Sequence, residues 1–139
     1  DEEFFLTYGD GLASINIAEL HKFHKKHGKV GTITGVRPPS RFGEIITKGS
    51  KVVSFNEKPL LSQGFINGGF FVFRRELFDY LSTDEGCVLE RGPLENLVRA
   101  GEMTMFPHTG YWQCMDPYRA NMLLNEQWNS GKAEWKVWG

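Results

Sequence analysis

Blocks of apolar and polar residues along this chain predict strands and helices in alternation. A continuous apolar run at 4–8 closes with glycines, which is typical of an interior strand of a parallel sheet. Apolar positions at helical spacing follow, opened by the cap pair Asn16 and Glu19 and closed by Gly28. The β-branched run at 30–36 predicts a second interior strand. Strand, helix and strand together predict a βαβ unit, which is right-handed in nearly every known case.

The rest of the chain predicts shorter elements. Strand-like stretches at 44–47 and 51–55 flank a glycine-containing loop and predict a hairpin. The remaining expected elements are strands over 67–73, 103–106 and 111–115, helices over 76–81 and 93–100, and a last helix opened by Asp116-Pro117 and stopped by Gly131. Strands that alternate with helices place the chain in the α/β class.

Composition and charge narrow the classes of protein to consider. A chain of 139 residues allows one domain with a real core. The apolar content of 40% is that of a globular chain, and the net charge of −1 argues against a nucleic-acid or membrane-surface partner. No apolar run approaches the roughly 18 residues of a membrane span, and no signal-peptide pattern is present. Cys87 and Cys114 fit no metal, redox or disulfide spacing, so reduced thiols in the cytoplasm are expected.

The beginning of the chain bears on domain organisation. Asp1-Glu2-Glu3 stands directly before a strand of interior type, with no starting methionine and no preceding element. Because an interior strand needs neighbours on both sides, we expect the chain to be a piece of a larger protein. An isolated piece would leave a sheet edge unpaired.

Asp10 is the first candidate for chemistry, because it follows the first predicted strand and stands between two glycines. Ligands of open α/β sheets collect beyond the carboxyl ends of the strands. A carboxylate there suits Mg²⁺, which takes oxygen ligands from one or two carboxylates and from substrate phosphates. The alternative is that Asp10 only stabilises a turn, and the pattern leaves both possibilities open.

Three further residues offer either chemistry or ordinary structure. Asp116 is a second carboxylate at a strand end, although Asp before Pro is also a strong helix-start signal. Lys58 could hold a phosphate as a point charge, with Glu57 hydrogen-bonded to a hydroxyl-rich ligand. The alternative for this pair is an exposed turn.

Two glycine-containing segments have the same double interpretation. Arg41 precedes Phe42-Gly43 and suits an anionic ligand beside a flexible backbone, but arginine is as common on surfaces. Asn67 followed by Gly68 would let a substrate approach the backbone closely, or would form a β-bulge at the start of a strand.

The histidines do not suggest a metal site. His21, His24 and His27 recur every three residues and drift around the predicted helix, whereas helical metal pairs usually stand four apart. We therefore interpret them as surface or helix-end residues. His108 lies in a turn with no evident partner.

Taken together, segments of this chain resemble the sugar-1-phosphate nucleotidylyltransferases, and most closely the glucose-1-phosphate cytidylyltransferases. They occur in the family's order along nearly the whole chain, and the ordered set is specific. The segments are Thr7-Tyr8-Gly9-Asp10-Gly11, Pro38-Pro39-Ser40-Arg41-Phe42-Gly43, Ser54-Phe55-Asn56-Glu57-Lys58-Pro59, Ile66-Asn67-Gly68-Gly69-Phe70-Phe71-Val72, Pro93-Leu94, Gly110-Tyr111-Trp112-Gln113-Cys114-Met115-Asp116 and Gly131-Lys132-Ala133-Glu134-Trp135-Lys136.

The resemblance implies a Rossmann-like nucleotidyltransferase fold with a mixed, mostly parallel sheet and flanking helices, in which residues 1–139 form the C-terminal part of a single domain. It implies that an oxygen of glucose 1-phosphate attacks the α-phosphorus of CTP, giving CDP-glucose and pyrophosphate. By this matching Asp10 and Asp116 would hold Mg²⁺, and Lys58 would act on the sugar phosphate. The expected substrate-binding residues are Gly9, Arg41, Gly43, Glu57, Lys58, Asn67 and Gly68.

Two departures from the family pattern change these expectations. Trp112 lies four residues before Asp116, so it cannot be matched to the tryptophan of the Gly-x-Trp-x-Asp pattern in many relatives. The family's N-terminal half, with its glycine-rich phosphate loop, is absent, so this chain alone is expected to be incomplete and inactive. The alternatives are a non-catalytic sugar-phosphate-binding or assembly module, and a relative that uses another nucleoside triphosphate. The complete protein is expected to be cytoplasmic and homo-oligomeric.

Overall fold

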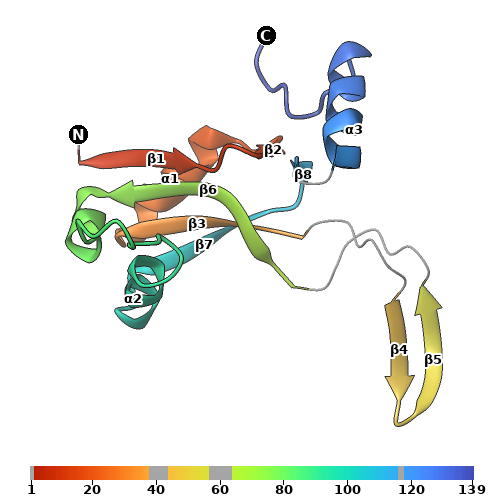
Figure 1. The fold of residues 1–139 in the computed structure, drawn as a ribbon, viewed down its shortest axis with the longest axis horizontal. Helices are drawn as coiled ribbons and strands as arrows, with labels where there is room; N and C mark the ends of the chain where they lie inside the picture. Colours follow the sequence, from red (N-terminus) through yellow and green to blue (C-terminus); the bar gives the residue numbers. More distant parts are fainter. Residues whose placement is uncertain (1, 38–43, 57–63, 116–117) are drawn as a thin grey trace.

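The computed structural model describes residues 2–37, 44–56, 64–115 and 118–139. The elements in these ranges are β1 (Glu3–Thr7), β2 (Gly11–Ala13), α1 (Ile17–His27), β3 (Gly31–Val36), β4 (Glu44–Lys48), β5 (Lys51–Asn56), β6 (Ile66–Arg74), the 3₁₀ helix η1 (Arg75–Tyr80), α2 (Pro93–Arg99), β7 (Met103–His108), β8 (Trp112–Cys114) and α3 (Tyr118–Asn129). They form one larger sheet and two short ribbons, β2 with β8 and β4 with β5 (Figure 1).

The larger sheet has the strand order β1-β6-β3-β7. β6 lies between β1 and β3 and is antiparallel to both, whereas β3 and β7 are parallel. The mixed sheet with flanking helices is confirmed, but parallel pairing does not predominate among the described strands. A strand covered by helices on both faces is apolar whichever way its neighbours run, so the apolar pattern could not reveal their direction.

The first strand departs from its expected place. β1 forms an edge of the described sheet and pairs on one side with β6, in the register Phe5↔Val72. Phe5 is 48% exposed, which is unlike a residue of an interior strand. The prediction of an interior, parallel first strand is therefore wrong for the described chain.

The helix that follows begins and ends where the sequence predicts. The Asn16 side chain accepts a hydrogen bond from the Glu19 backbone N–H at 3.1 Å, and Gly28 adopts the left-handed conformation with φ of 68°. β2 and α1 together connect β1 to β3, which run in the same direction with β6 inserted between them. The predicted βαβ unit is thus present, but its two strands are separated in the sheet by β6, which comes later in the sequence.

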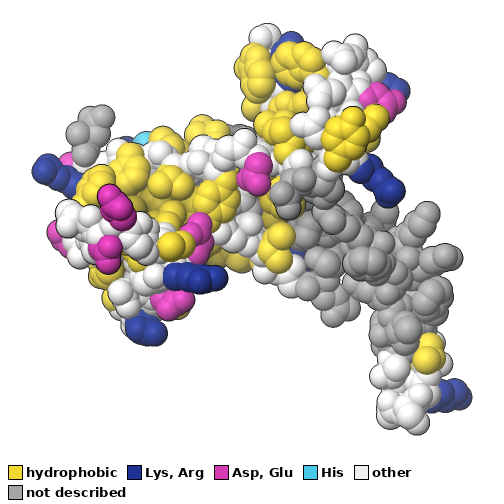
Figure 2. Space-filling model, in the orientation of Figure 1, with side chains coloured by type: hydrophobic (Ala, Val, Ile, Leu, Met, Phe, Trp, Pro, Cys, Tyr) yellow, Lys and Arg dark blue, Asp and Glu magenta, His cyan; other side chains and the backbone are white. Residues whose placement is uncertain are grey.

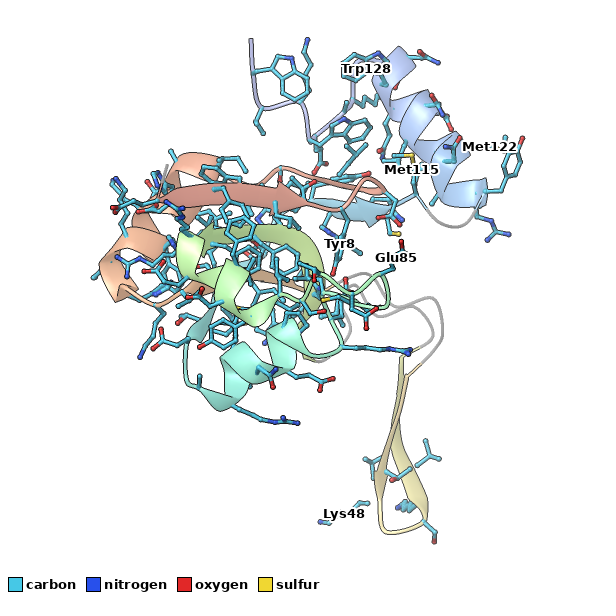
Figure 3. All side chains as sticks on the ribbon, turned by 60° about the vertical axis from the view of Figure 1, so that its left-hand side comes forward. Tyr8, Lys48, Glu85, Met115, Met122 and Trp128 are labelled. Carbon is cyan, nitrogen blue, oxygen red and sulfur yellow. The ribbon has the colours of Figure 1, made fainter. Side chains whose placement is uncertain are left out.

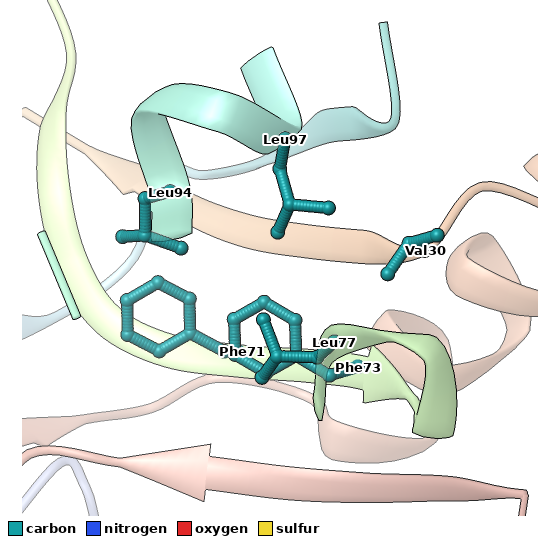
Figure 4. Packing of buried hydrophobic residues seen from close by; sticks show 6 residues of the cluster. All are labelled: Val30, Phe71, Phe73, Leu77, Leu94 and Leu97. Carbon is teal, nitrogen blue, oxygen red and sulfur yellow. The ribbon is translucent and has the colours of Figure 1, made fainter. Parts of the chain in front are cut away.

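β6 carries the core on both of its faces, because successive side chains of a strand point to opposite sides. Phe71 and Phe73 are fully buried and stack with ring centroids 5.3 Å apart. They pack with Leu77 of η1 and with Leu94 and Leu97 of α2 (Figure 4). Val72 faces the other way, into a second cluster with Leu20 of α1. Helices therefore cover both faces of the sheet.

The remaining elements largely match the sequence prediction. The β4–β5 hairpin, α2 and the short strands β7 and β8 are confirmed, while the helix expected over 76–81 is the 3₁₀ helix η1. The hairpin extends away from the larger sheet (Figure 1). The last helix is present as α3, but its predicted start at Asp116-Pro117 lies outside the described residues. Within the described ranges, no helix is long and apolar enough to cross a membrane.

One histidine of α1 is not the surface or helix-end residue that the sequence predicts. His24 is only 1% exposed, and its Nδ1 lies 2.7 Å from the hydroxyl of Thr32 on β3. His27 contacts the same hydroxyl through Nε2 at 2.6 Å, and His21 pairs with Glu3 at 2.8 Å. Three-residue spacing drifts around a helix slowly enough to keep all three rings near the sheet. His24 is therefore a buried packing residue, whereas His21 and His27 are partly exposed and His27 lies at the end of the helix, as the sequence predicts.

Candidate functional site

The candidate site lies where three separate segments meet beyond the end of β1. The turn between β1 and β2 carries Asp10, the first residues of β6 supply Asn67 and its glycines, and β8 lies alongside β2. A pocket of about 170 Å³ lies among these segments. It is lined by Tyr8, Asp10, Gly11, Asn67, Gly68, Gly69, Phe70, Trp112 and Cys114. The structure thus brings together the predicted residues Asp10, Asn67 and Gly68.

Asp10 is held by its backbone and leaves its carboxylate accessible. Its carbonyl accepts a hydrogen bond from the Met115 N–H at 2.7 Å, next to the β2–β8 pair Gly11↔Cys114. The side chain is exposed, and the Cys114 thiol donates to Oδ2 at 3.7 Å. Figure 3 labels Met115 near the start of α3. Because Met115 directly precedes Asp116, β2–β8 pairing brings the chain just before the second predicted carboxylate against Asp10.

The two glycines at the start of β6 are required by close packing on both sides. A Cβ at Gly68 would lie 2.8 Å from Cγ1 of Val36 and 3.0 Å from the carbonyl oxygen of Thr34. Gly69 has φ of 80°, and a Cβ there would lie 2.6 Å from Cδ2 of Tyr8. The register between β3 and β6 also shifts beside these residues. A register shift at this strand start agrees with the β-bulge alternative, and the shifted segment itself lines the pocket.

Trp112 closes one side of the pocket. Its indole Nε1 donates to the Gly68 carbonyl at 2.9 Å, and its ring packs against the second core cluster. The spacing of Trp112 to Asp116 differs from the family pattern and therefore predicts no site role for Trp112. The structure places it at the candidate site, where it fixes the backbone beside Asn67.

Tyr8, Asn67 and Glu90 form a hydrogen-bond chain at the pocket. The Tyr8 hydroxyl donates to Glu90 Oε1 at 2.5 Å and accepts from Asn67 Nδ2 at 2.9 Å. Asn67 Oδ1 in turn accepts from the Gly69 N–H at 2.9 Å. Figure 3 shows Tyr8, which lies two residues before Asp10.

The hydrogen bond between Tyr8 and Glu90 shifts the pKa values of both groups. Burial, and then the hydrogen bond to Glu90, raise the pKa of Tyr8 to about 12. The hydrogen bond from Tyr8 lowers the pKa of Glu90 below its usual value. The phenol therefore keeps its proton and donates it to an ionised carboxylate.

Tyr8, Glu90, Trp112 and Cys114 were missed as site residues. The only signal for Tyr8 and Cys114 was their nearness in sequence to Asp10 and Asp116. No sequence signal pointed to Glu90, since it stands in the turn before α2 and is separated from Tyr8 by 82 positions. That turn is held by the backbone bonds of Arg91 N–H to Val88 O and Leu94 N–H to Leu89 O.

Several predicted residues are not tested by this geometry. Arg41, Gly43, Glu57, Lys58 and Asp116 lie outside the described residues. Gly9 stands on the same exposed turn as Asp10.

The donor set available for a metal is correspondingly small. Among the described residues, no group of three or more His, Cys, Asp or Glu side chains could hold a metal ion. Asp10 alone still fits Mg²⁺, because this ion usually keeps several waters and takes only one or two carboxylates from a protein. Its exposed carboxylate, contacted only weakly by a thiol, has oxygen lone pairs available for that role.

A larger cavity at the opposite end of β6 is less suited to chemistry. It has about 440 Å³ and is lined by Glu2, Arg74, Arg75, Glu76, Phe78 and Asp79. It contains none of the predicted residues, and five of its six lining residues are charged. We therefore place the candidate site at the smaller pocket.

Comparison with known proteins identifies the family. Residues 1–113 match the family described as nucleotidyl transferase. The chain belongs to this nucleotidyl transferase family. It is 44% identical over 138 residues to a glucose-1-phosphate cytidylyltransferase of Salmonella typhimurium, and 43% identical over the same length to a protein of Bacillus subtilis named as a probable glucose-1-phosphate cytidylyltransferase. These alignments cover 99% of this chain but only 53% and 54% of the relatives.

Solved structures support the fold of this nucleotidyl transferase chain. A crystal structure of a Bacillus anthracis protein in complex with sucrose matches 99% of the chain and 57% of that protein, with a TM-score of 0.61 and 17% identity. At this identity the likeness concerns the fold alone, and it confirms the nucleotidyltransferase-like architecture. The chain spans about half the length of the curated relatives that it matches.

Proposed function

We propose that this chain forms the sugar-phosphate side of a glucose-1-phosphate cytidylyltransferase. The observation that carries the proposal is the identity of 43–44%, spread over 99% of the chain, to relatives with that name. The pocket adds support, since it combines an accessible carboxylate with an exposed polar amide. Such a surface suits a ligand rich in hydroxyls and phosphate oxygens.

The proposed reaction is a nucleotidyl transfer. A phosphate oxygen of glucose 1-phosphate forms a bond to the α-phosphorus of CTP, and the bond from that phosphorus to the bridging β-phosphate oxygen breaks. The products are CDP-glucose and pyrophosphate, with no protein nucleophile. Catalysis of this kind depends on positioning and on neutralisation of negative charge.

In this proposal each residue has a binding or positioning role. Asp10 and Asp116 would hold Mg²⁺, which when bound neutralises phosphate charge. Lys58 would bind the sugar phosphate, and Arg41 would add positive charge near it. The sugar hydroxyls would contact Glu57 and Asn67. The backbone at Gly9 and Gly43 would let the ligand approach closely, and Gly68 would line the ligand pocket.

The test is pyrophosphate release by the 139-residue chain from CTP and glucose 1-phosphate in the presence of Mg²⁺, together with calorimetric binding of glucose 1-phosphate. Because the chain spans half of its relatives, we expect binding with little or no turnover. No binding of any sugar 1-phosphate would contradict the proposal. In a complete, active form of the enzyme, turnover with GTP equal to that with CTP would favour a different nucleotide, as in the Sulfolobus acidocaldarius relative named a mannose-1-phosphate guanyltransferase, which is 30% identical over 128 residues.

A further inference from the structure

The hydrogen-bond chain at the pocket determines how the Asn67 amide is oriented. The Gly69 N–H is a donor, so it must face the amide oxygen, Oδ1. At the other end, the Tyr8 hydroxyl uses its single proton on Glu90 and can only accept from the amide nitrogen, Nδ2. Both ends require the same orientation, and a flipped amide would break two hydrogen bonds.

Glu90 is the residue that makes Tyr8 an acceptor. Without a carboxylate there, the phenol could rotate its proton toward Asn67 and would then compete with the amide N–H for the same space. The carboxylate reaches the site from the turn before α2, and the neighbouring residue Leu89 packs against the first core cluster. The phenol ring is held separately, edge-on to Phe71 with ring centroids 5.6 Å apart. The position of the hydroxyl is therefore fixed from two independent elements.

The fixed amide still has capacity for a ligand. One Nδ2 hydrogen and one lone pair of Oδ1 remain after the two internal hydrogen bonds. The neighbouring Gly68 carbonyl already accepts from Trp112. Asn67 is exposed and lines the pocket, so its amide offers one donor and one acceptor side by side. Adjacent hydroxyls of a sugar present the complementary pair.

We propose that Tyr8 and Glu90 are positioning residues that orient the Asn67 amide for recognition of the sugar hydroxyls. This inference rests on the proposed function, because it takes the ligand to be a sugar 1-phosphate. Glu90 is not among the residues that line the pocket, and the hydroxyl of Tyr8, which does line it, is already engaged by Glu90 and Asn67. Their contribution is that the amide is held in the correct orientation before the sugar arrives, which reduces the ordering cost of binding.

The experiment compares two ligands on the 139-residue chain with Mg²⁺ present, by NMR titration of the backbone and the Asn side-chain amides. Glucose 1-phosphate carries the hydroxyls, and inorganic phosphate lacks them. Tyr8→Phe removes the hydroxyl and keeps the ring on Phe71. The matched control is Tyr111→Phe, which removes a hydrogen bond of 2.8 Å to Gln127 in another part of the chain. A second pair is Glu90→Gln with Glu102→Gln as its control, since the Glu102 side chain accepts from the Val30 N–H and does not line the pocket.

We expect Tyr8→Phe to weaken the binding of glucose 1-phosphate about tenfold, and Glu90→Gln about threefold, because one or two modest hydrogen bonds lose their alignment. The affinity for inorganic phosphate should stay unchanged in both variants, and both controls should bind like wild type. A general loss of structure would lower the affinity for both ligands equally. A loss of affinity for glucose 1-phosphate alone therefore points to the positioning role.

Two contrary outcomes are distinguishable. If wild type binds glucose 1-phosphate and Tyr8→Phe binds it equally well, or weakens phosphate to the same degree, the positioning role is overturned and the proposed function stands. If wild type binds no sugar 1-phosphate, the proposed function fails and this inference fails with it.

Discussion

The hydroxyl of Thr32 lies 2.7 Å from Nδ1 of His24 in the buried layer between β3 and α1. The same hydroxyl lies 2.6 Å from Nε2 of His27, whose Nδ1 accepts the Lys29 N–H at 2.9 Å. Neutral His27 therefore carries its proton on Nε2 and donates it to Thr32, which then donates to His24. This leaves the proton of His24 on Nε2, an atom that is buried and has no hydrogen-bond partner within the described residues.

The hydrogen-bonded set His27, Thr32 and His24 predicts that the free energy of unfolding falls in mild acid. Burial is the main cause that lowers the pKa of His24 to about 4, and burial also lowers the pKa of His27. The unfolded chain binds the proton first as pH falls, so the contribution of His24 is complete above pH 6.5 and disappears between 6.5 and about 4. We expect urea denaturation to show a loss of about 3 kcal/mol from this residue over that range.

The control for this prediction is a second histidine of the same helix. His24→Leu should flatten the pH dependence of the unfolding free energy, whereas His21→Gln, at the more exposed pair with Glu3, should leave it nearly as steep. Equal slopes in wild type and His24→Leu would contradict the assignment.

Gly69→Ala should destabilise the fold beyond the ordinary cost of a positive φ. The left-handed backbone costs a non-glycine residue about 1 kcal/mol, and the clash with Tyr8 adds to it. Gly28→Ala is the matched control, because Gly28 has φ of 68° and open space around its Cβ position. We expect Gly69→Ala to cost at least 1 kcal/mol more than Gly28→Ala in urea denaturation. A smaller difference would mean that the Tyr8 ring yields easily.

Asp10→Asn should abolish most Mg²⁺-dependent turnover in an active form of the enzyme. Loss of one carboxylate ligand removes several kcal/mol of charge stabilisation, or about a hundredfold to a thousandfold in rate. Asp79→Asn, in η1 and distant in sequence from the pocket, serves as the control and should be neutral. Steady-state pyrophosphate release measures both. Near-normal turnover of Asp10→Asn would remove this residue from the mechanism.

Exposed apolar side chains predict that the isolated chain associates. Met122 and Trp128 of α3 are 56% and 50% exposed, and Trp138 beyond the helix is 58% exposed. Figure 2 shows apolar side chains gathered over this C-terminal part, and the β1 edge offers unpaired backbone groups. Sedimentation velocity should detect dimers or larger species that decrease in Met122→Glu. A stable monomer at high concentration would count against this prediction.

The sequence predicted local structure well and strand neighbours poorly. The limits of α1 followed from Asn16 and Gly28, whose effects act within one helical turn. The position of β6 between β1 and β3 could not be read from an apolar run, since the pairing depends on residues at least thirty positions apart. The burial of His24 could not be predicted for the same reason, because the fold places Thr32 opposite it.

The candidate site shows the same division. Asp10, Asn67 and Gly68 were predicted from motifs, and the structure joins them at one pocket. Glu90 could not be predicted, because nothing in the segment around it distinguishes it from a surface carboxylate. Trp112 was set aside on its spacing to Asp116, whereas the structure gives it a contact with Gly68 that spacing does not encode.

The long sequence separations at the pocket have a consequence for how the protein is made. Tyr8 meets Glu90 across 82 positions, and Asp10 meets Cys114 across 104. Contacts of such range form late, because the intervening chain must first lose its freedom. On the ribosome, β1 and its turn emerge long before β8 exists, so Asp10 remains without its neighbours until most of the chain has been synthesised. Competence for ligand binding therefore arises close to the completion of folding and cannot precede it.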